Sequence, residues 1–372
     1  MKIGFLTIGE GGSNIGEYAA QKGFPVITVN SAQVDLDKLK IIPKDSRIHL
    51  SGWEGAGRNR EIGKEAMITH SEKIFEITND KFEDCDMVFA VGSSAGGTGS
   101  GGLPIGIEIL SGLDCSIGAI TILPEIGESP KANMNALECF SELSKFENLG
   151  SVIVIDNEKS KKVFENKDKS KIYEESNKQF IDNLQDVMLL TRKSSYTSNF
   201  DKNDFLEIIG ERGCTIIAKT VISTDEIKEP QNIADSIKDS WNKVCSPDLW
   251  KGQILKAAIL GRVPKEITTM VDSNLIFKDT GTPYEIFEAY YPNDEFKNHC
   301  IFYTVLSGLV FPTERLNEIE KGIQLIEQSL IDKVEVARKQ TFETTNWNTK
   351  FKRNSKKQEN KPSLSDRLAK FK

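Results

Sequence analysis

The fold of this chain follows from one glycine-rich run, Val91-Gly92-Ser93-Ser94-Ala95-Gly96-Gly97-Thr98-Gly99-Ser100-Gly101-Gly102. Residues 86–91 in front of it, an acidic Asp86 followed by an apolar run, predict a buried strand, and residues 103–110 can continue as a helix. Without Cβ atoms, consecutive backbone N–H groups can converge on phosphate oxygens, and the following helix adds the positive end of its dipole. Thr98 and Ser100 add hydroxyl donors. The run therefore predicts a phosphate-binding loop.

Two other interpretations of this run fail. A flexible glycine linker would not continue directly from an apolar strand. A P-loop needs Lys after its last glycine, and no Lys or Arg occurs between Lys81 and Lys131. The run 96–101, Gly-Gly-Thr-Gly-Ser-Gly, instead resembles the signature loop of the tubulin/FtsZ superfamily of GTPases.

Length and composition are those of a globular protein large enough for two domains, with 372 residues, 38% of them hydrophobic and 28% charged. No apolar run approaches the roughly 20 residues of a membrane span, and no signal-peptide pattern opens the chain. We therefore expect a cytoplasmic protein without membrane contact. The 6 cysteines form no Cys-x-x-Cys pair and the 3 histidines show no metal-ligand spacing, so we predict no metal site built from protein ligands.

Charge is unevenly distributed along the chain. The net charge is −7, yet residues 350–372 carry nine basic and two acidic residues, a net +7 that leaves −14 for the remainder. An acidic body is a poor surface for wrapping DNA, whereas a basic, polar tail can contact an acidic partner. We expect the tail, residues 347–372, to be disordered.

The N-terminal region predicts an α/β nucleotide-binding fold. Residues 2–8 read as a strand, residues 9–14 as a glycine-rich loop, and the stretch to Lys22 as an amphipathic helix. A Rossmann dinucleotide site is the rival interpretation. It would require Gly at position 14, where the chain has Asn14, and an acidic residue after the second strand, which ends in Asn30-Ser31.

Three further loops strengthen the resemblance to the tubulin/FtsZ superfamily. The first contains the paired glycines, the second reads Asn-Ser-Ala-Gln over residues 30–33, and the third reads Gly-Ala-Gly-Arg-Asn over residues 55–59. The resemblance implies that these loops and the signature bind GTP or GDP. The nucleotide-binding residues it implies are Gly11, Gly12, Ser13, Asn14, Asn30, Gly57, Arg58, Asn59, Gly96, Gly97, Thr98, Gly99 and Ser100.

The resemblance also implies contacts to the ribose and the base. Glu128 matches a family Glu near the ribose, but the Arg expected four residues later is Ala132, and Lys131 or Asn133 are candidate substitutes. Asn157 follows a buried strand at a position near the ribose or base. Tyr173 and Asn177, four apart on one helix, match the aromatic and amide residues that face guanine. The default role of that helix, residues 169–193, is nevertheless structural core.

Two carboxylates mark the predicted catalytic loop. Asp201 and Asp204 open a helix, where Asp residues commonly cap the first turn and complement the helix dipole. The string from Asn199 to Asp204 also resembles the superfamily's Asn-x-Asp-x-x-Asp motif. Carboxylates three apart can orient a water, so the resemblance implies catalysis by Asp201 and Asp204.

The remaining chain predicts a second domain with a mixed sheet. We expect strands at 213–222, 254–260, 276–277 and 299–309, a helix over 225–244, and a long helix from Pro312. The predicted organisation is a Rossmann-like GTP-binding domain over 1–168, a central helix over 169–193, a C-terminal α+β domain over 194–311, a helix over 312–346 and the basic tail.

The resemblance implies a GTPase that polymerises head to tail, with Mg²⁺ as its metal and an active site shared between adjacent subunits. Three functions fit. One is segregation of plasmid or phage DNA through a DNA-binding adaptor that grips the tail, with DNA contacted indirectly. The others are an FtsZ-like division ring and a nucleotide-dependent filament without significant hydrolysis. The long helix and basic tail favour the first, and the paired aspartates argue against the last.

Overall fold

The computed structural model describes residues 1–293 and 298–343. The chain divides into two units, Met1–Gln324 and Leu325–Lys372, and the sheet and all its covering helices belong to the first. The predicted segments 1–168, 169–193 and 194–311 all fall within that first unit. The predicted tail, 347–372, lies outside the described residues.

The secondary structure alternates strands and helices through the first half of the chain. The strands are β1 (Ile3–Ile8), β2 (Val26–Asn30), β3 (Arg47–His49), β4 (Met87–Ser93), β5 (Ser116–Leu123), β6 (Ser151–Asp156), β7 (Gly213–Ser223), β8 (Lys256–Arg262), β9 (Glu285–Tyr291) and β10 (His299–Leu309). The helices are α1 (Gly9–Gln21), α2 (Gln33–Asp37), α3 (Arg60–Thr69), α4 (Ser71–Lys81), α5 (Thr98–Leu110), α6 (Pro130–Leu143), α7 (Asn157–Val163), α8 (Lys169–Leu190), α9 (Lys202–Ile209), α10 (Pro230–Asn242), α11 (Ser273–Ile276) and α12 (Thr313–Glu343). Short 3-10 turns occupy Lys44–Ser46, Thr224–Glu226, Leu249–Lys251 and Lys265–Met270.

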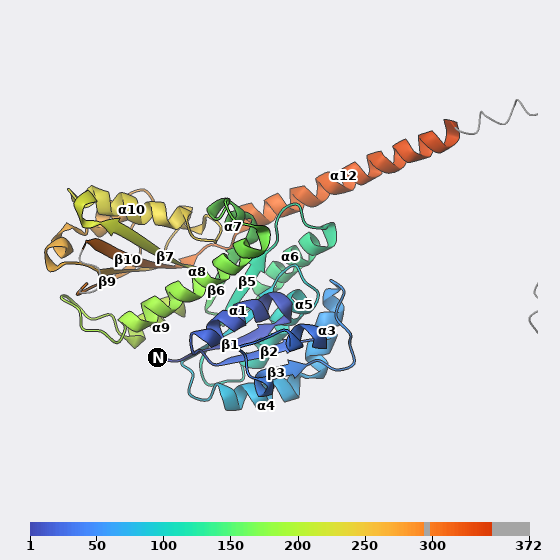
Figure 1. Cartoon of the computed structure of the whole chain (residues 1–372), viewed down its shortest axis with the longest axis horizontal. Helices are drawn as coiled ribbons and strands as arrows, with labels where there is room; N and C mark the ends of the chain where they lie inside the picture. The colour runs from blue at the N-terminus through green and yellow to red at the C-terminus, as the bar shows by residue number, and fades with distance from the viewer. Residues whose placement is uncertain (294–297, 344–372) are drawn as a thin grey trace, which may run out of the picture. The chain divides into compact units, whose positions relative to one another are not determined.

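The ten strands of the described residues join one sheet in the order β3-β2-β1-β4-β5-β6-β7-β10-β8-β9. The strands from β3 to β7 are parallel, β10 is antiparallel to both β7 and β8, and β9 is parallel to β8. Strands β6 and β7 pair only at Ser151↔Gly213 and Val152↔Cys214. The predicted mixed α/β class with a Rossmann-like parallel sheet is therefore confirmed, and the two halves of the sheet meet at a short seam (Figure 1).

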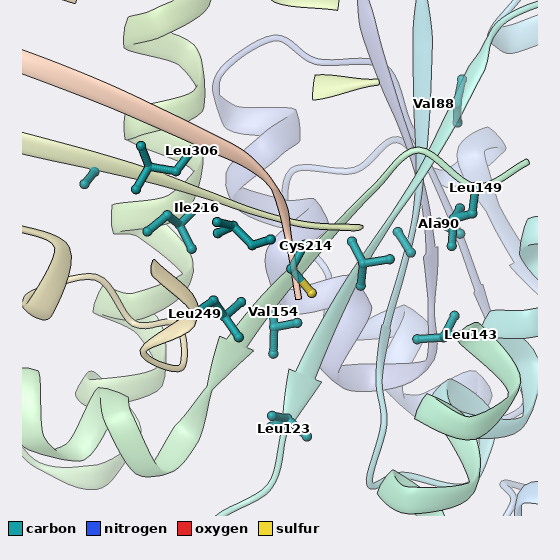
Figure 2. Packing of buried hydrophobic residues seen from close by; sticks show 14 of the residues in the cluster. Val88, Ala90, Leu123, Leu143, Leu149, Val154, Cys214, Ile216, Leu249 and Leu306 are labelled. Atoms are coloured by element: carbon teal, nitrogen blue, oxygen red, sulfur yellow. The ribbon is translucent and has the colours of Figure 1, made fainter. Parts of the chain in front are cut away.

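Both faces of the parallel strands are buried, which explains their continuous apolar sequences. In β1 and β4, Phe5 and Phe89 point into the core on one face, while Leu6 and Ala90 point into the core on the other. The second of these layers crosses the seam, where Val154 packs in the same cluster as residues of β7 and β10 (Figure 2). Helix α8 contacts both α1 and β7, so it spans the two halves of the sheet.

Several sequence predictions differ from the structure. The glycine-rich residues 9–14 are helical, since α1 begins directly at Gly9, whose φ of 72° makes the turn out of β1. Likewise α5 begins at Thr98, inside the signature run. In both runs the missing side chains let a helical turn lie closely against a neighbouring strand. A methyl group on Gly99, for example, would stand 2.8 Å from the carbonyl oxygen of Ser93.

Further differences lie in the second half of the sheet. Residues 276–277, predicted as a strand, belong to α11 and its C-terminal cap, and the strand β9 was not predicted. Asp272 starts α11 by accepting a hydrogen bond from the Asn274 amide at 2.9 Å, and Phe277 stacks on Trp241. A two-residue apolar run carries no periodicity, so capping and packing decided its conformation. The predicted helix over 225–244 begins later, at Pro230.

Candidate nucleotide-binding site

A cavity of about 580 Å³ opens where the parallel strands end at their carboxyl edge. This is the edge at which ligands bind in open α/β sheets, because the loops and helix N-termini converge there. The residues that line it come from the first, second and third loops, the signature loop, the loop after β5 and helix α8. They are residues 8–11, 14, 30–32, 35, 55–58, 93, 95–99, 128 and 173.

Most of the predicted nucleotide-binding residues border this cavity, and some do not. Those that border it are Gly11, Asn14, Asn30, Gly57, Arg58, Gly96, Gly97, Thr98, Gly99, Glu128 and Tyr173. Those that do not are Gly12, Ser13, Asn59, Ser100, Asn157 and Asn177. Several of the residues that do not border the cavity form hydrogen bonds that hold its loops in place.

The signature loop presents its backbone to the cavity at the start of α5. A Cβ atom on Gly96 would have no heavy atom within 4 Å, so this face of the loop is open. The first turn of α5 contains no acidic residue, which leaves the positive end of its dipole uncompensated. Thr98 shares a hydrogen bond of 2.7 Å with the hydroxyl of Ser31, which fixes the second loop against the signature loop.

Ser13, Ser100 and Asn59 support the loops from behind. The Ser13 hydroxyl donates to the carbonyl of Gly9 at 2.9 Å, and the fully buried Ser100 hydroxyl donates to the carbonyl of Gly96. Asn59 caps α3 by accepting from the Glu61 amide at 3.1 Å. These side chains therefore shape the first, signature and third loops and do not border the cavity themselves.

Arg58 brings a guanidinium group to the cavity. It has a positive φ of 60°, an uncommon conformation for a residue with a side chain. Its Nη1 donates to the hydroxyl of Ser129 at 2.8 Å, and its Nη2 lies 3.6 Å from Glu128. Among the described lining residues Arg58 is the one cationic side chain.

Neither proposed substitute for the missing ribose-binding Arg borders the cavity. Asn133 is fully buried, and its amide donates to the carbonyls of Ile126 at 3.1 Å and Glu128 at 3.4 Å. Lys131 borders a separate hollow beside α3 and α6. Asn133 therefore holds the Glu128 loop, and Arg58 supplies the positive charge at Glu128.

Tyr173 borders the cavity from α8 and is anchored by Glu125. Its hydroxyl donates to the carboxylate of Glu125, which also forms ion pairs with Lys169 at 3.1 Å and Lys161 at 3.2 Å. Burial alone would raise the pKa of Glu125, but the hydrogen bonds from Tyr173, Lys169 and Lys161 outweigh it and lower the pKa. Burial and the neighbouring Glu125 carboxylate raise the pKa of Tyr173, so its phenol stays protonated.

Asn177 lies one helical turn beyond Tyr173 and is buried. Asn157 is the first residue of α7, whose cap is Asp156. The Asp156 side chain forms a buried ion pair with Arg315 of α12, at 2.9 Å. This pair attaches the start of α12 to the end of β6.

Asp201 and Asp204 lie at the other edge of the sheet. They form a reciprocal capping box on α9, in which Asp201 accepts from the Asn203 and Asp204 amides and Asp204 accepts from the Asp201 amide at 2.7 Å. Lys202, between them, pairs at 2.6 Å with Asp86, which directly precedes β4. The signature loop follows the other end of β4, and a seven-residue strand is about 20 Å long. The two aspartates therefore cannot reach the cavity of their own subunit.

Sequence reasoning missed several residues at this site. Glu10, Ser31 and Asp35 line the cavity, and Glu125 and Asn135 hold its walls. Glu10 and Asp35 stand next to predicted site residues and could have been included on that ground. Glu125 and Asn135 gave no signal, because their partners lie far away in the sequence.

The cavity suits Mg²⁺ bound with a nucleotide. Among the described residues no group of three or more His, Cys, Asp or Glu side chains could hold a metal ion. Mg²⁺ keeps several waters and commonly binds through substrate phosphates with one or two carboxylates, so a protein cage is not required. The carboxylates of Glu10 and Asp35 at the cavity fit that chemistry. Within the described part of the chain, no helix is long and apolar enough to cross a membrane.

Comparison with known proteins identifies the cavity-bearing half of the chain. Residues 2–165 match the model of the Tubulin/FtsZ family, GTPase domain. These residues are therefore similar to the GTPase domains of the tubulin/FtsZ family. All of the cavity except Tyr173 lies within this domain.

Individual relatives extend the likeness beyond the GTPase domain. The tubulin-like protein TubZ of Bacillus cereus is 33% identical over 248 residues, which cover 61% of this chain and 57% of that protein. TubZ of Clostridium botulinum C phage is 28% identical over 253 residues, covering 64% of each. The chain thus spans less than two thirds of the length of these relatives.

Solved structures share the fold over most of the chain. A GTPyS-form protofilament of Bacillus thuringiensis serovar israelensis TubZ matches with a TM-score of 0.76 at 19% identity, covering 90% of this chain and 94% of that one. A solved structure of a type III plasmid segregation TubZ matches with a TM-score of 0.71 at 19% identity, covering 88% of this chain and 93% of that one. At these identities the likeness shows a common fold.

Proposed function

We propose that this chain binds GTP in the cavity, hydrolyses it to GDP and phosphate, and polymerises head to tail into dynamic filaments. One observation carries the proposal. The phosphate-binding loop lies at one edge of the parallel sheet, and the paired aspartates lie at the opposite edge, about one strand length away. A head-to-tail contact brings the two edges of neighbouring subunits together, which completes an active site that neither subunit has alone.

The binding roles follow from the geometry of the cavity. The amides of the signature loop and the N-terminus of α5 bind the phosphates, and the Arg58 guanidinium compensates their charge. Tyr173 packs against the base. Glu128 and Asn30 offer acceptors to the ribose hydroxyls. Mg²⁺, held by phosphate oxygens near Glu10 and Asp35, would offset the charge that develops on the phosphates.

The aspartates act on the nucleotide of the next subunit. Each carboxylate has one oxygen engaged in the capping box, so both side chains are oriented before they meet water. They can then orient the attacking water and accept its proton. Because the nucleotide and the aspartates belong to different subunits, assembly switches hydrolysis on.

We further propose that the filaments segregate plasmid or phage DNA in the cytoplasm. The names of the relatives support this role, since one is a phage TubZ and another is a plasmid segregation TubZ. A small DNA-binding adaptor would grip the basic tail, residues 347–372, and connect the filament to DNA. The paired aspartates favour a filament that hydrolyses GTP over a purely structural filament.

Phosphate release against protein concentration tests the proposal, with electron microscopy of the same samples. We expect turnover per subunit to rise with concentration as filaments appear, with GTP preferred over ATP, and filaments to persist with a slowly hydrolysed GTP analogue. Turnover per subunit that is independent of concentration would rule out the shared site. Equal use of ATP and GTP would rule out the guanine-specific pocket.

A further inference from the structure

Asn135 stands behind the phosphate loop and does not border the cavity. It lies in α6, only 5% exposed. Its amide nitrogen donates to the carbonyl oxygens of Arg58 at 3.0 Å, Ala95 at 3.2 Å and Gly96 at 3.3 Å. One side chain thus holds the third loop and the signature loop together.

The chemistry fixes the orientation of this amide. If the group were flipped, its oxygen would face three carbonyl oxygens, an arrangement of like dipoles without any proton between them. The NH₂ group must therefore face the loops. No other described side chain donates to more than one of these three carbonyls.

The carbonyls that Asn135 anchors determine where the phosphate donors point. In a trans peptide the C=O of one residue and the N–H of the next point in opposite directions. Anchoring the Ala95 and Gly96 carbonyls behind the loop therefore turns the N–H groups of Gly96 and Gly97 away from α6, and both residues line the cavity. Within the described part of the chain neither N–H is bonded to a protein acceptor.

We propose that Asn135 is a positioning residue for the nucleotide phosphates: it holds the Gly96 and Gly97 amides aimed into the cavity before the ligand arrives. Preorganised donors bind more tightly because the ordering of the loop is completed in the free protein. The inference rests on the proposed function, because it takes the ligand to be a guanine nucleotide bound in this cavity.

A second brace on the same loop comes from Arg60 of α3, which an ion pair holds against helix α6. Arg60, which is 5% exposed, donates to the carbonyl of Ser100 at 3.3 Å and forms an ion pair at 2.7 Å with Glu142 of α6. Helix α6 therefore fixes both ends of the turn that opens α5. Asn135 is the member of this brace that contacts the carbonyls next to the phosphate donors.

The test is a comparison of phosphate-dependent binding between Asn135→Ala and the wild-type chain. Titrations with GTP, GDP and guanosine separate the contribution of the phosphates from that of the base and ribose. We expect the affinity for GTP and GDP to fall about tenfold or more. A tenfold change corresponds to about 1.4 kcal/mol, which is the scale of one or two lost hydrogen bonds. The affinity for guanosine should change by less than about threefold. A variant with merely weaker packing would lose affinity for all three ligands alike.

Asn183→Ala is the matched control. Asn183 is also 5% exposed, and its amide donates to a single carbonyl, that of Ile217 at 3.2 Å, on β7 away from the cavity. It should lower thermal stability without changing the ratio of GTP to guanosine affinity. If Asn135→Ala does not fold, Asn135→Ser keeps one donor and should show a smaller loss in the same phosphate-dependent direction.

The outcomes are distinguishable. Wild-type chain that binds no guanine nucleotide would overturn the proposed function and this inference with it. Wild-type chain that binds GTP, combined with Asn135 variants that fold and keep the wild-type ratio of GTP to guanosine affinity, would overturn the inference alone.

Discussion

Tyr173 owes its position in the cavity to a single buried carboxylate. Glu125 accepts a hydrogen bond from the Tyr173 hydroxyl, and Lys161 and Lys169 stabilise its negative charge. The Lys169 ammonium also lies 5.8 Å from the centre of the Tyr173 ring. This cluster fixes the Tyr173 ring at the cavity before a base binds. A mobile ring would lose conformational entropy on binding the base, which would weaken the binding.

Replacing Glu125 with an uncharged residue should change how the free energy of unfolding depends on pH. Its pKa is lowered from the ordinary value of 4.5 in the folded protein, so its contribution is present above pH 4.5 and is lost as the pH falls through the lower folded pKa. We expect Glu125→Gln to be less stable than wild type at pH 7 by about 1 kcal/mol. Denaturant unfolding from pH 7 to pH 3 should show this difference shrinking below pH 4.5.

Glu61→Gln is the control for this prediction. The Glu61 side chain is 66% exposed and forms a surface pair with Lys64, so its removal should change stability by less than about 0.5 kcal/mol at any pH. The difference in stability between Glu125→Gln and wild type could instead stay constant from pH 7 to pH 3. That result would show that the packing of Glu125, and not its charge, stabilises the fold.

At the scale of elements, the spacing between helices and strands shapes the cavity. Helix α1 starts directly after β1 and packs against β4, where a side chain on Gly12 would overlap the carbonyl of Val91. Gly97 plays the same part between loops, because a methyl group there would stand 2.7 Å from the Cβ atom of Ala56. Gly96 differs, because a methyl group there would extend into the open cavity and would have no other heavy atom within 4 Å.

Two identical substitutions should separate these roles. Gly12→Ala pushes α1 off β4, and we expect it to destabilise the fold by about 1–3 kcal/mol, as for overpacked cores. Gly96→Ala places its methyl group in the cavity and should leave stability within about 1 kcal/mol of wild type while lowering GTP affinity. Denaturant unfolding and nucleotide titration measure the two effects. A Gly96→Ala protein that binds GTP normally would exclude Gly96 from the phosphate site.

At the scale of the whole molecule, one continuous sheet connects two functional edges. The parallel strands carry the cavity at their carboxyl ends, while α9 and its two aspartates lie at the other ends. The short β6–β7 seam, the core layer that crosses it and helix α8 join both halves. Because of the distance between these edges, the active site that we propose requires a neighbouring subunit.

A labelling experiment decides whether the aspartates act on a neighbour. Asp204→Asn keeps a hydrogen-bond acceptor for the capping box, so folding and GTP binding should persist while hydrolysis falls roughly a hundredfold. The variant is loaded with γ-labelled GTP and mixed with excess wild-type protein and unlabelled GTP. Labelled phosphate should be released, because wild-type neighbours supply the missing carboxylate.

The same loaded variant mixed with excess variant is the control, and it should retain its label. Label that is kept equally in both mixtures would show that each subunit hydrolyses its own GTP, and the shared site would be wrong. Electron microscopy of the variant alone should show filaments that persist, since their GTP is not converted to GDP.

Local sequence was sufficient for most of the strands, the signature loop and the capped helix starts. Runs of β-branched residues predict buried strands, because both faces of a parallel sheet exclude water. Glycine clusters and the Asp201 cap act through their immediate neighbours, so their patterns can be read within a few residues. The helical conformation of residues 9–14 could not be read in this way, since close packing against β4 decided it.

The parts of the site that depend on distant contacts were decided only by the tertiary structure. Asn135 bonds to the carbonyl of Arg58 across 77 positions, and Tyr173 bonds to Glu125 across 48. The family resemblance had implied that Asp201 acts on a neighbouring subunit, and the direction of β4 accounts for its place at the edge opposite the cavity. Hydrogen bonds and ion pairs form wherever the folded backbone brings partners within about 3 Å, and no local pattern encodes which partners those are.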